Sequence, residues 1–145
     1  MTIRRLLVAN RGEIARRVFR TAKEMGIFTV AVHSDGDSDA PFVADADLGV
    51  ALGGTTASES YLDGEKILAA AISVGADAIH PGYGFLSENA DFAKAVTDAG
   101  ITWIGPPPQA IAAMGDKLAA KRTMVDAEVP TLPSVEVSES VDVGA

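Results

Sequence analysis

The sequence predicts an α/β fold, in which helices cover both faces of a parallel β-sheet. Three predicted helices end in a glycine that leads directly into an apolar strand, at Gly26, Gly75 and Gly100. Glycine is favoured just past a helix because it readily adopts the left-handed conformation. The strands that follow are continuously apolar, which is typical of parallel strands buried on both sides. The repeated joint therefore indicates successive βαβ units of a Rossmann-like sheet.

The first βαβ unit begins near the N-terminus. Residues 3–9 form an apolar strand, residues 10–12 a tight turn, and residues 27–32 a second apolar strand after the intervening helix. Helical spacing predicts that this helix buries one apolar face against the sheet. The residues of this predicted face are Ile14, Val18, Ala22 and Met25.

The next part of the chain is less regular. Residues 42–46 predict a helical turn, residues 48–52 a short third strand, and residues 56–59 match a helix capping box. A helix with apolar spacing then leads into a strand over residues 76–79. The apolar residues of that helix are Ile67, Leu68, Ala71 and Ile72.

Residues 80–89, His-Pro-Gly-Tyr-Gly-Phe-Leu-Ser-Glu-Asn, join that strand to a predicted helix over 88–99. We expect Ser87 to cap this helix and Glu88 to lie in its first turn, where the helix dipole favours an anion. In an open α/β sheet, loops at the carboxyl ends of strands face the ligand crevice. The residues therefore favour a functional loop, although glycines and a proline after a strand also suit a plain turn.

Composition excludes several classes of function. The 145 residues carry a net charge of −8 without a dense basic patch, which argues against sequence-independent nucleic-acid binding. There is no cysteine, so disulfides, thiolate metal sites and a cysteine nucleophile are excluded. No apolar run is long enough to span a membrane, and no signal peptide is recognisable. We expect a cytoplasmic protein with no nucleic-acid or membrane partner.

Neither a dinucleotide motif nor a metal loop is complete. The first strand–turn–helix lacks the three-glycine spacing, and no GxxxxGK[ST] phosphate loop is present. Asp35, Asp37 and Asp39 resemble the start of a calcium loop, but Gly36 stands between the first two and no glutamate closes the loop. We therefore predict a solvated, turn-forming acidic loop and no metal site.

Three consecutive prolines, residues 106–108, predict a domain edge because proline cannot continue a strand or a helix interior. The first domain would span 1–108. Residues 109–145 would hold a short helix, then Gly-Asp-Lys, then a longer helix to about Ala127, with no second core. We expect them to be the truncated start of a second domain in a longer protein.

Several segments stand in the order and spacing of the N-terminal domain of biotin carboxylases, the ATP-grasp enzymes of acetyl-CoA, propionyl-CoA and pyruvate carboxylases. The runs NRGEIA and HPGYGFLSEN are specific to that family. The resemblance implies a pre-ATP-grasp domain followed by the helical start of an ATP-grasp domain. The matching segments are 8–15, 29–34, 60–62, 80–89, 104–106 and 114–117.

The resemblance implies an ATP-dependent ligase, the alpha subunit of an acyl-CoA carboxylase. ATP and bicarbonate would give carboxyphosphate, and the carboxyl group would pass to biotin on a carrier domain, with Mg²⁺ or Mn²⁺ neutralising the phosphates. The implied partners are the biotin carboxyl carrier domain, a carboxyltransferase subunit and a second copy of the chain. Arg20 and Glu24 become candidate dimer-interface residues.

The resemblance also assigns roles to single residues. Lys117 matches the ATP-contacting lysine of the family. A cation in a first helical turn is somewhat more easily explained by an anionic ligand than by stability, although an ordinary solvated lysine is the commoner case. Tyr83 and Gly84 become candidate neighbours of biotin, with Glu88 behind them. We expect the catalytic and metal-binding residues beyond this chain, and the chain alone to be inactive.

Two other functions fit the same residues. Another ATP-grasp ligase would share the domain that precedes the grasp, and the sequence around Tyr83 is what favours biotin. A noncatalytic module used only for assembly would explain the lack of a catalytic half. An unchanged monomer on replacing Arg20 by glutamate would count against such an assembly role.

Overall fold

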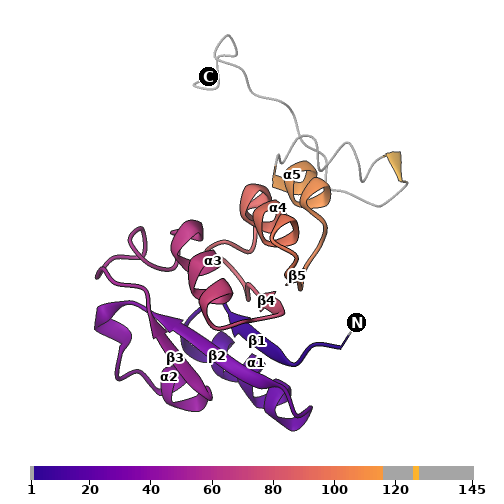
Figure 1. Ribbon diagram of the computed structural model, residues 1–145. Coiled ribbons are helices and arrows are strands. Elements are labelled where there is room, and N and C mark those ends of the chain that lie inside the picture. The colour runs from indigo at the N-terminus through magenta and orange to yellow at the C-terminus, as the bar shows by residue number, and fades with distance from the viewer. Residues whose placement is uncertain (1, 116–125, 128–145) are drawn as a thin grey trace, which may run out of the picture.

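The computed structural model describes residues 2–115 and 126–127, and it has five parallel strands in one sheet (Figure 1). The strand order is β3-β2-β1-β4-β5. Every neighbouring pair is parallel. The strands are β1 (Arg5–Val8), β2 (Phe28–His33), β3 (Leu48–Ala51), β4 (Ala78–His80) and β5 (Thr102–Trp103).

Helices cover both faces of the sheet, as predicted. The first two helices pack on one face and on each other, and the next two pack on the opposite face. No helix in the described residues is long and apolar enough to cross a membrane. The helices are α1 (Gly12–Glu24), the 3-10 turn η1 (Asp35–Asp37), α2 (Pro41–Asp45), α3 (Gly64–Ser73), α4 (Ala90–Asp98) and α5 (Pro108–Gly115).

Successive residues of β1 enter opposite layers of the core. Leu6 and Val8 pack with Phe19 of α1, while Leu7 packs with Ile67 of α3. Side chains alternate between the faces of a strand, so a strand covered on both faces must be apolar throughout. This is why continuous apolar runs predicted the architecture correctly.

The three helix–glycine–strand joints are confirmed. Gly26, Gly75 and Gly100 follow α1, α3 and α4, and their φ angles are +76°, +68° and +78°. Residues with a Cβ rarely adopt such angles. Glycine therefore lets each helix end and turn directly into the next strand.

The buried face of α1 differs from the predicted one. Ala15 and Phe19 are buried together with Ala22, whereas Ile14 and Val18 are only half-buried. Met25, which lies just past the helix, is 70% exposed. The prediction was wrong because the helix packs on the sheet with the face that carries Phe19, its largest apolar side chain.

The capping box at residues 56–59 forms, but it does not begin a helix. The Thr56 N–H donates to Glu59 Oε1 at 3.2 Å, and the Glu59 N–H donates to Thr56 Oγ1 at 3.3 Å. These bonds close a turn, and α3 begins only at Gly64. Its cap is Asp63, whose carboxylate accepts the Lys66 N–H at 3.1 Å.

The acidic loop is solvated only in part. Asp35 and Asp39 are exposed, as predicted. Asp37 is not solvated in this way, because its carboxylate pairs with the Arg11 guanidinium at 2.7 Å and its side chain is only 13% exposed. No local pattern indicates this partner, which lies 26 residues earlier in the chain.

Candidate functional site

The strand order reverses between β1 and β4. From β1 the chain moves outward through β2 and β3, and from β4 it moves outward through β5 on the other side. The connections that leave the carboxyl ends of β1 and β4 therefore diverge, and ligands bind at such switch points in open α/β sheets. Asn10 and Arg11 follow β1, and the loop 80–89 starts at the end of β4.

The side chain of Asn10 links these two connections by hydrogen bonds. Its side chain is 1% exposed, and Nδ2 donates to the carbonyl oxygens of Pro81 at 2.9 Å and Tyr83 at 2.7 Å. Oδ1 accepts the Arg11 N–H at 2.8 Å. Both amide hydrogens are thus committed to the loop 80–89. Sequence reasoning assigned Asn10 only to a turn, because its partners lie 71 and 73 residues away.

Gly82 is required by this contact. Its φ is +65°, and a Cβ there would lie 2.6 Å from Asn10 Nδ2 and 2.9 Å from Ile14 Cγ2. Gly84 has a φ of +70° but faces open space. Both glycines thus adopt conformations that are unfavourable to other residues, and at Gly82 the space is restricted as well.

His80 stabilises the loop from its first residue. The Gly82 N–H donates to His80 Nδ1 at 3.0 Å, so Nδ1 is an acceptor and the neutral ring carries its proton on Nε2. Burial lowers the pKa of this half-buried imidazole, which favours the same neutral form. The structure thus gives His80 a backbone partner within the loop.

Tyr83 and Glu88 lie on one loop but line different cavities. Tyr83 is 79% exposed and lines a cavity of about 470 Å³ with His80 and Ile104. Glu88 lines a cavity of about 360 Å³ against α5, where Ile111 forms part of the wall. A ligand beside the tyrosine ring would thus occupy a different space from one beside the carboxylate.

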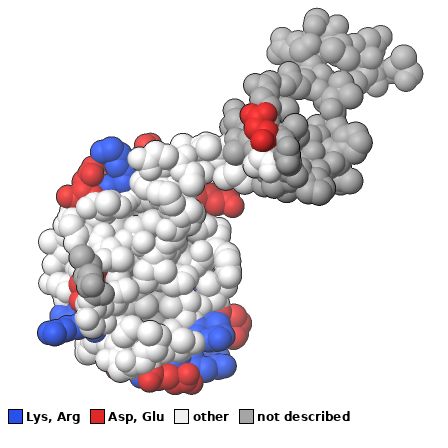
Figure 2. Space-filling view, turned by 90° about the vertical axis from the view of Figure 1, so that its right-hand side faces the viewer, with Lys and Arg blue, Asp and Glu red and all other residues white. Residues whose placement is uncertain are grey.

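The surface near the edge strand β5 carries few charges. Figure 2 shows the side of the molecule where the N-terminus and β5 lie, and Lys, Arg, Asp and Glu are mostly at its rim. Met25 and Tyr83, which line the same cavity of about 470 Å³, are the most exposed large apolar side chains among the described residues. The tyrosine therefore stands beside apolar surface.

The start of α4 differs from the prediction. Asn89 is the cap, and its side-chain oxygen accepts the Phe92 N–H at 2.9 Å. Ser87 lies in the preceding turn, so Glu88 is outside the helix and Asp91 occupies the first turn. Asparagine caps helices as well as serine does, and the turn at the end of the loop delays the first helical residue.

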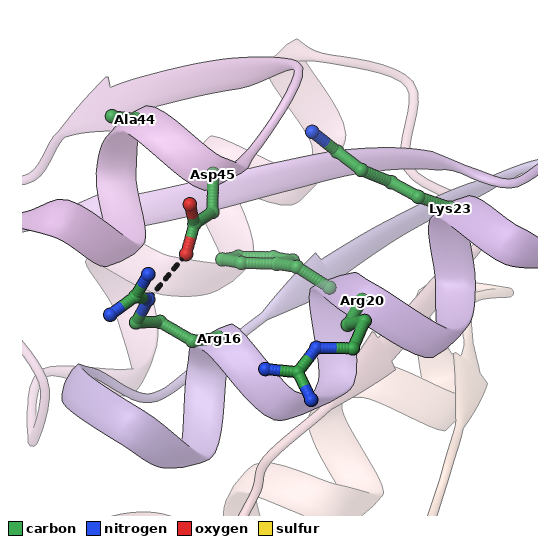
Figure 3. A pocket seen from close by; sticks show the side chains of 6 residues that line it. Arg16, Arg20, Lys23, Ala44 and Asp45 are labelled. Atoms are coloured by element: carbon green, nitrogen blue, oxygen red, sulfur yellow. Dashed lines mark hydrogen bonds and ion pairs between the residues drawn. The ribbon is translucent and has the colours of Figure 1, made fainter.

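Arg20 and Glu24 are exposed on α1, and Arg20 lines a cavity of about 310 Å³ between α1 and α2 (Figure 3). In that cavity Arg16 Nε donates to Asp45 at 2.6 Å, which ties the two helices together. Lys23 lines the same cavity. No ion pair joins Arg20 to Glu24 in the described part of the chain, and both residues are exposed.

Lys117 lies outside the described residues, and its role stays a prediction. The same holds for the helix predicted up to about Ala127 and for the division of the chain into 1–108 and 109–145.

Within residues 2–115 and 126–127, no group of three His, Asp or Glu side chains could hold a metal ion. The described site consequently consists of the loop 80–89 and the residues that fix it.

Comparison with known proteins identifies the family to which this chain belongs. The family described as the biotin carboxylase N-terminal domain matches residues 2–111. The biotin-dependent acyl-coenzyme A carboxylase alpha3 subunit of Mycobacterium leprae is 56% identical over 90% of this chain, and the biotin carboxylase of Nostoc is 53% identical over 94%. The chain spans 22% and 30% of the lengths of these two relatives.

A solved structure agrees with these relatives. The biotin carboxylase domain of a thermophilic 2-oxoglutarate carboxylase, bound to bicarbonate, has a TM-score of 0.87 and 48% identity. The match covers 92% of this chain and 30% of that one. The resemblance expected from the sequence is confirmed by these matches. The chain belongs to the biotin carboxylase N-terminal domain family.

Proposed function

We propose that this chain is the N-terminal part of an ATP-dependent biotin carboxylase, in the alpha subunit of a cytoplasmic acyl-CoA carboxylase. Bicarbonate would be activated by ATP as carboxyphosphate, and its carboxyl group would pass to biotin on a carrier domain. The observation that carries the proposal is the loop 80–89, held by Asn10 at the switch point of a sheet whose relatives are biotin carboxylases. A carboxyltransferase subunit would then take the carboxyl group from the carrier.

In this proposal the main role of the chain is to bind and orient biotin and ATP. Tyr83 and Gly84 present an exposed ring and an unobstructed backbone to the biotin side, and Glu88 lies behind them in the neighbouring cavity. Lys117 contacts ATP at the start of an ATP-grasp domain that follows residue 108. Mg²⁺ or Mn²⁺ would neutralise the phosphates, and its ligands would lie outside the described residues.

The role of the loop is tested in the complete carboxylase with Tyr83→Ala. We expect the KM for biotin to rise several-fold while bicarbonate-dependent ATP hydrolysis measured without biotin stays within twofold. Tyr83→Phe keeps the ring and serves as the matched control. An unchanged KM for biotin in the alanine variant would contradict the proposal and would favour another ATP-grasp ligase.

The isolated 145-residue chain should not catalyse the reaction. The chain spans 22% to 30% of the length of the two relatives above, and its described residues hold no metal site. We expect no biotin-dependent ATP cleavage by the purified chain. Turnover above the background of a mock preparation would overturn this part of the proposal.

We further propose that the chain forms a homodimer through α1. The support is that Arg20 and Glu24 are exposed charges on α1 and form no ion pair with each other in the part of the chain that the structure describes. Arg20→Glu should shift the protein to the monomer in size-exclusion chromatography, and Lys94→Glu on α4 is the control for an exposed cation replaced elsewhere. A monomer in both the parent and the Arg20 variant would refute the dimer.

A further inference from the structure

We infer that Tyr61 is a positioning residue, which acts with Arg11 and Asp37 to hold the loop 80–89 so that Tyr83 is presented correctly. The inference deepens the proposed function and rests on it, since it takes the loop to be the biotin-facing one. Tyr61 itself does not line the cavity beside Tyr83. It acts through Phe85, which lies two residues after Tyr83.

The first part of the arrangement is a charged pair between two connections. Arg11 Nε donates to Asp37 Oδ2 at 2.8 Å, and Nη2 donates to Oδ1 at 2.7 Å. A planar guanidinium that binds both oxygens of one carboxylate fixes distance and orientation together. Arg11 follows β1 and Asp37 follows β2, so the pair ties together the connections that leave two adjacent strands.

Tyr61 joins this pair from a third segment. Its hydroxyl donates to Asp37 Oδ2 at 2.5 Å and accepts the Ser34 N–H at 3.1 Å. The Arg11 guanidinium carbon lies 5.7 Å from the centre of the Tyr61 ring. Tyr61 as a whole is only 3% exposed. A buried phenol hydroxyl needs hydrogen-bond partners, and here Asp37 and Ser34 supply them. The hydroxyl thus has two fixed partners and one orientation.

The ring of Tyr61 contacts the functional loop. The ring centroids of Tyr61 and Phe85 are 5.5 Å apart, and the planes are tilted by 46°. Phe85 has a φ of +48°, and it is the only residue other than glycine with a positive φ among those the structure describes. Such a conformation is unfavourable for a side chain with a Cβ and persists only where surrounding contacts hold it. The aromatic contact with Tyr61 is one that holds it.

Tyr83 therefore lies between two constraints that start from adjacent residues. Asn10 binds the carbonyl oxygen of Tyr83 directly. Arg11, the next residue, acts on Phe85 through Asp37 and Tyr61. The turn after β1 thus sets the loop on both sides of its exposed tyrosine, which explains why the two motifs of the resemblance, NRGEIA and HPGYGFLSEN, meet in space.

The first test uses the 145-residue chain and does not depend on any activity. Tyr61→Phe keeps the ring and removes only the hydroxyl, and Asp37→Asn keeps the shape and removes the charge. We expect both to shift the backbone amide resonances of Tyr83, Gly84 and Phe85 in ¹H–¹⁵N spectra. Asp39→Asn, an exposed carboxylate two residues away, is the control. Unmoved resonances at 83–85 in both variants overturn the inference.

The second test measures kinetics in the complete carboxylase. Tyr61→Phe should raise the KM for biotin several-fold, with bicarbonate-dependent ATP hydrolysis in the absence of biotin unchanged within twofold. A general loss of stability would lower both activities together. If Tyr83→Ala raises the KM for biotin but Tyr61→Phe leaves it unchanged, the inference about Tyr61 is overturned and the proposed role of the loop stands. An unchanged KM in both variants overturns the proposed role of the loop, and the inference with it.

Discussion

The two ends of the sheet use similar polar side chains in different ways. At the amino end, Asp77 accepts the N–H groups of Arg4 at 3.0 Å and Arg5 at 3.2 Å, which fixes the start of β4 to the start of β1. Asp47 likewise accepts the Thr29 N–H at 2.9 Å, between β3 and β2. Each carboxylate there binds the backbone of one adjacent strand.

At the carboxyl end, the polar side chains join connections. Asn10 binds the loop that follows β4, and Asp37 binds both the turn after β1 and Tyr61. Each contact at the amino end joins two neighbouring strands, whereas those at the carboxyl end join several loops. The difference teaches that the charge of an acid does not reveal whether it joins two strands or several loops.

The largest expected effect is at Asn10. Asn10→Ala would leave the buried carbonyl oxygen of Pro81 and the part-buried carbonyl oxygen of Tyr83 without this donor, at about 1–3 kcal/mol for a buried group. We expect a loss of about 3 kcal/mol in the free energy of unfolding, measured by urea denaturation. Asn89→Ala, which removes only a helix cap, should cost about 1 kcal/mol. Equal losses would mean that Asn10 is no more than a turn residue.

A matched pair of glycines separates conformation from space. Gly82→Ala combines a left-handed φ with a Cβ 2.6 Å from Asn10, and we expect it to cost about 2 kcal/mol. Gly84→Ala meets nothing within 4 Å and should cost only about 1 kcal/mol for its φ. Thermal unfolding of the two variants measures the difference, and a larger loss at Gly84 would contradict the packing of Gly82 on Asn10.

The pH dependence of stability sharpens the comparison between acids. The hydrogen bonds from Arg11 hold the pKa of Asp37 below its usual value. A lowered folded-state pKa contributes stability above the unfolded pKa of about 3.9, and this is lost as the pH falls through the folded value. Asp37→Asn should thus cost about 1.5 kcal/mol at pH 7 and progressively less below about pH 4.

Asp47 provides the control for this titration. Its pKa is lowered as well, first by the backbone hydrogen bond from Thr29, so Asp47→Asn should lose stability with the same sign of pH dependence. It is exposed, and its loss should be smaller than that of Asp37→Asn. Only Asp37→Asn should also shift the amide resonances of residues 83–85. A shift there in the Asp47 variant would erase the distinction between the two ends of the sheet.

The smallest effect on the free energy of unfolding is expected on α4, away from both ends of the sheet. Lys94 pairs with Asp98 at 2.7 Å on α4, with side chains 69% and 62% exposed. Such exposed helical pairs contribute about 0.3–0.5 kcal/mol and weaken with salt. Lys94→Ala should therefore change the free energy of unfolding by less than about 0.5 kcal/mol. A larger change that persists in high salt would show that α4 is more tightly coupled to the core than its exposed charges indicate.

Local signals predicted most of the fold. Glycine joints and apolar runs depend on residues close in sequence, and they identified the strands, the helices on both faces and the loop 80–89 after β4. The buried face of α1 and the cap of α4 were wrong by one or two residues, because Phe19 and Asn89 competed with equally plausible neighbours. Packing, which spacing does not reveal, decided between them.

The candidate site was predictable only as a loop. Its position followed from the motif, but the residues that fix its shape come from elsewhere in the chain. Asn10 and Tyr61 lie 73 and 24 residues from the groups they bind, Tyr83 and Asp37. Nothing in a single sequence pairs such positions, since each residue alone is equally consistent with a turn or a core. Strand order, which brings β1 beside β4, supplies the missing proximity.

The edge strand β5 bears on how this protein behaves at high concentration. It has only two residues, and the Trp103 indole N–H donates to the Pro106 carbonyl oxygen at 3.1 Å, which links the strand to the segment that follows it. The prolines at 106–108 that follow have no backbone N–H to offer. A short edge bordered by prolines is a poor template for a strand from another molecule, so this edge protects the sheet against amyloid-like growth.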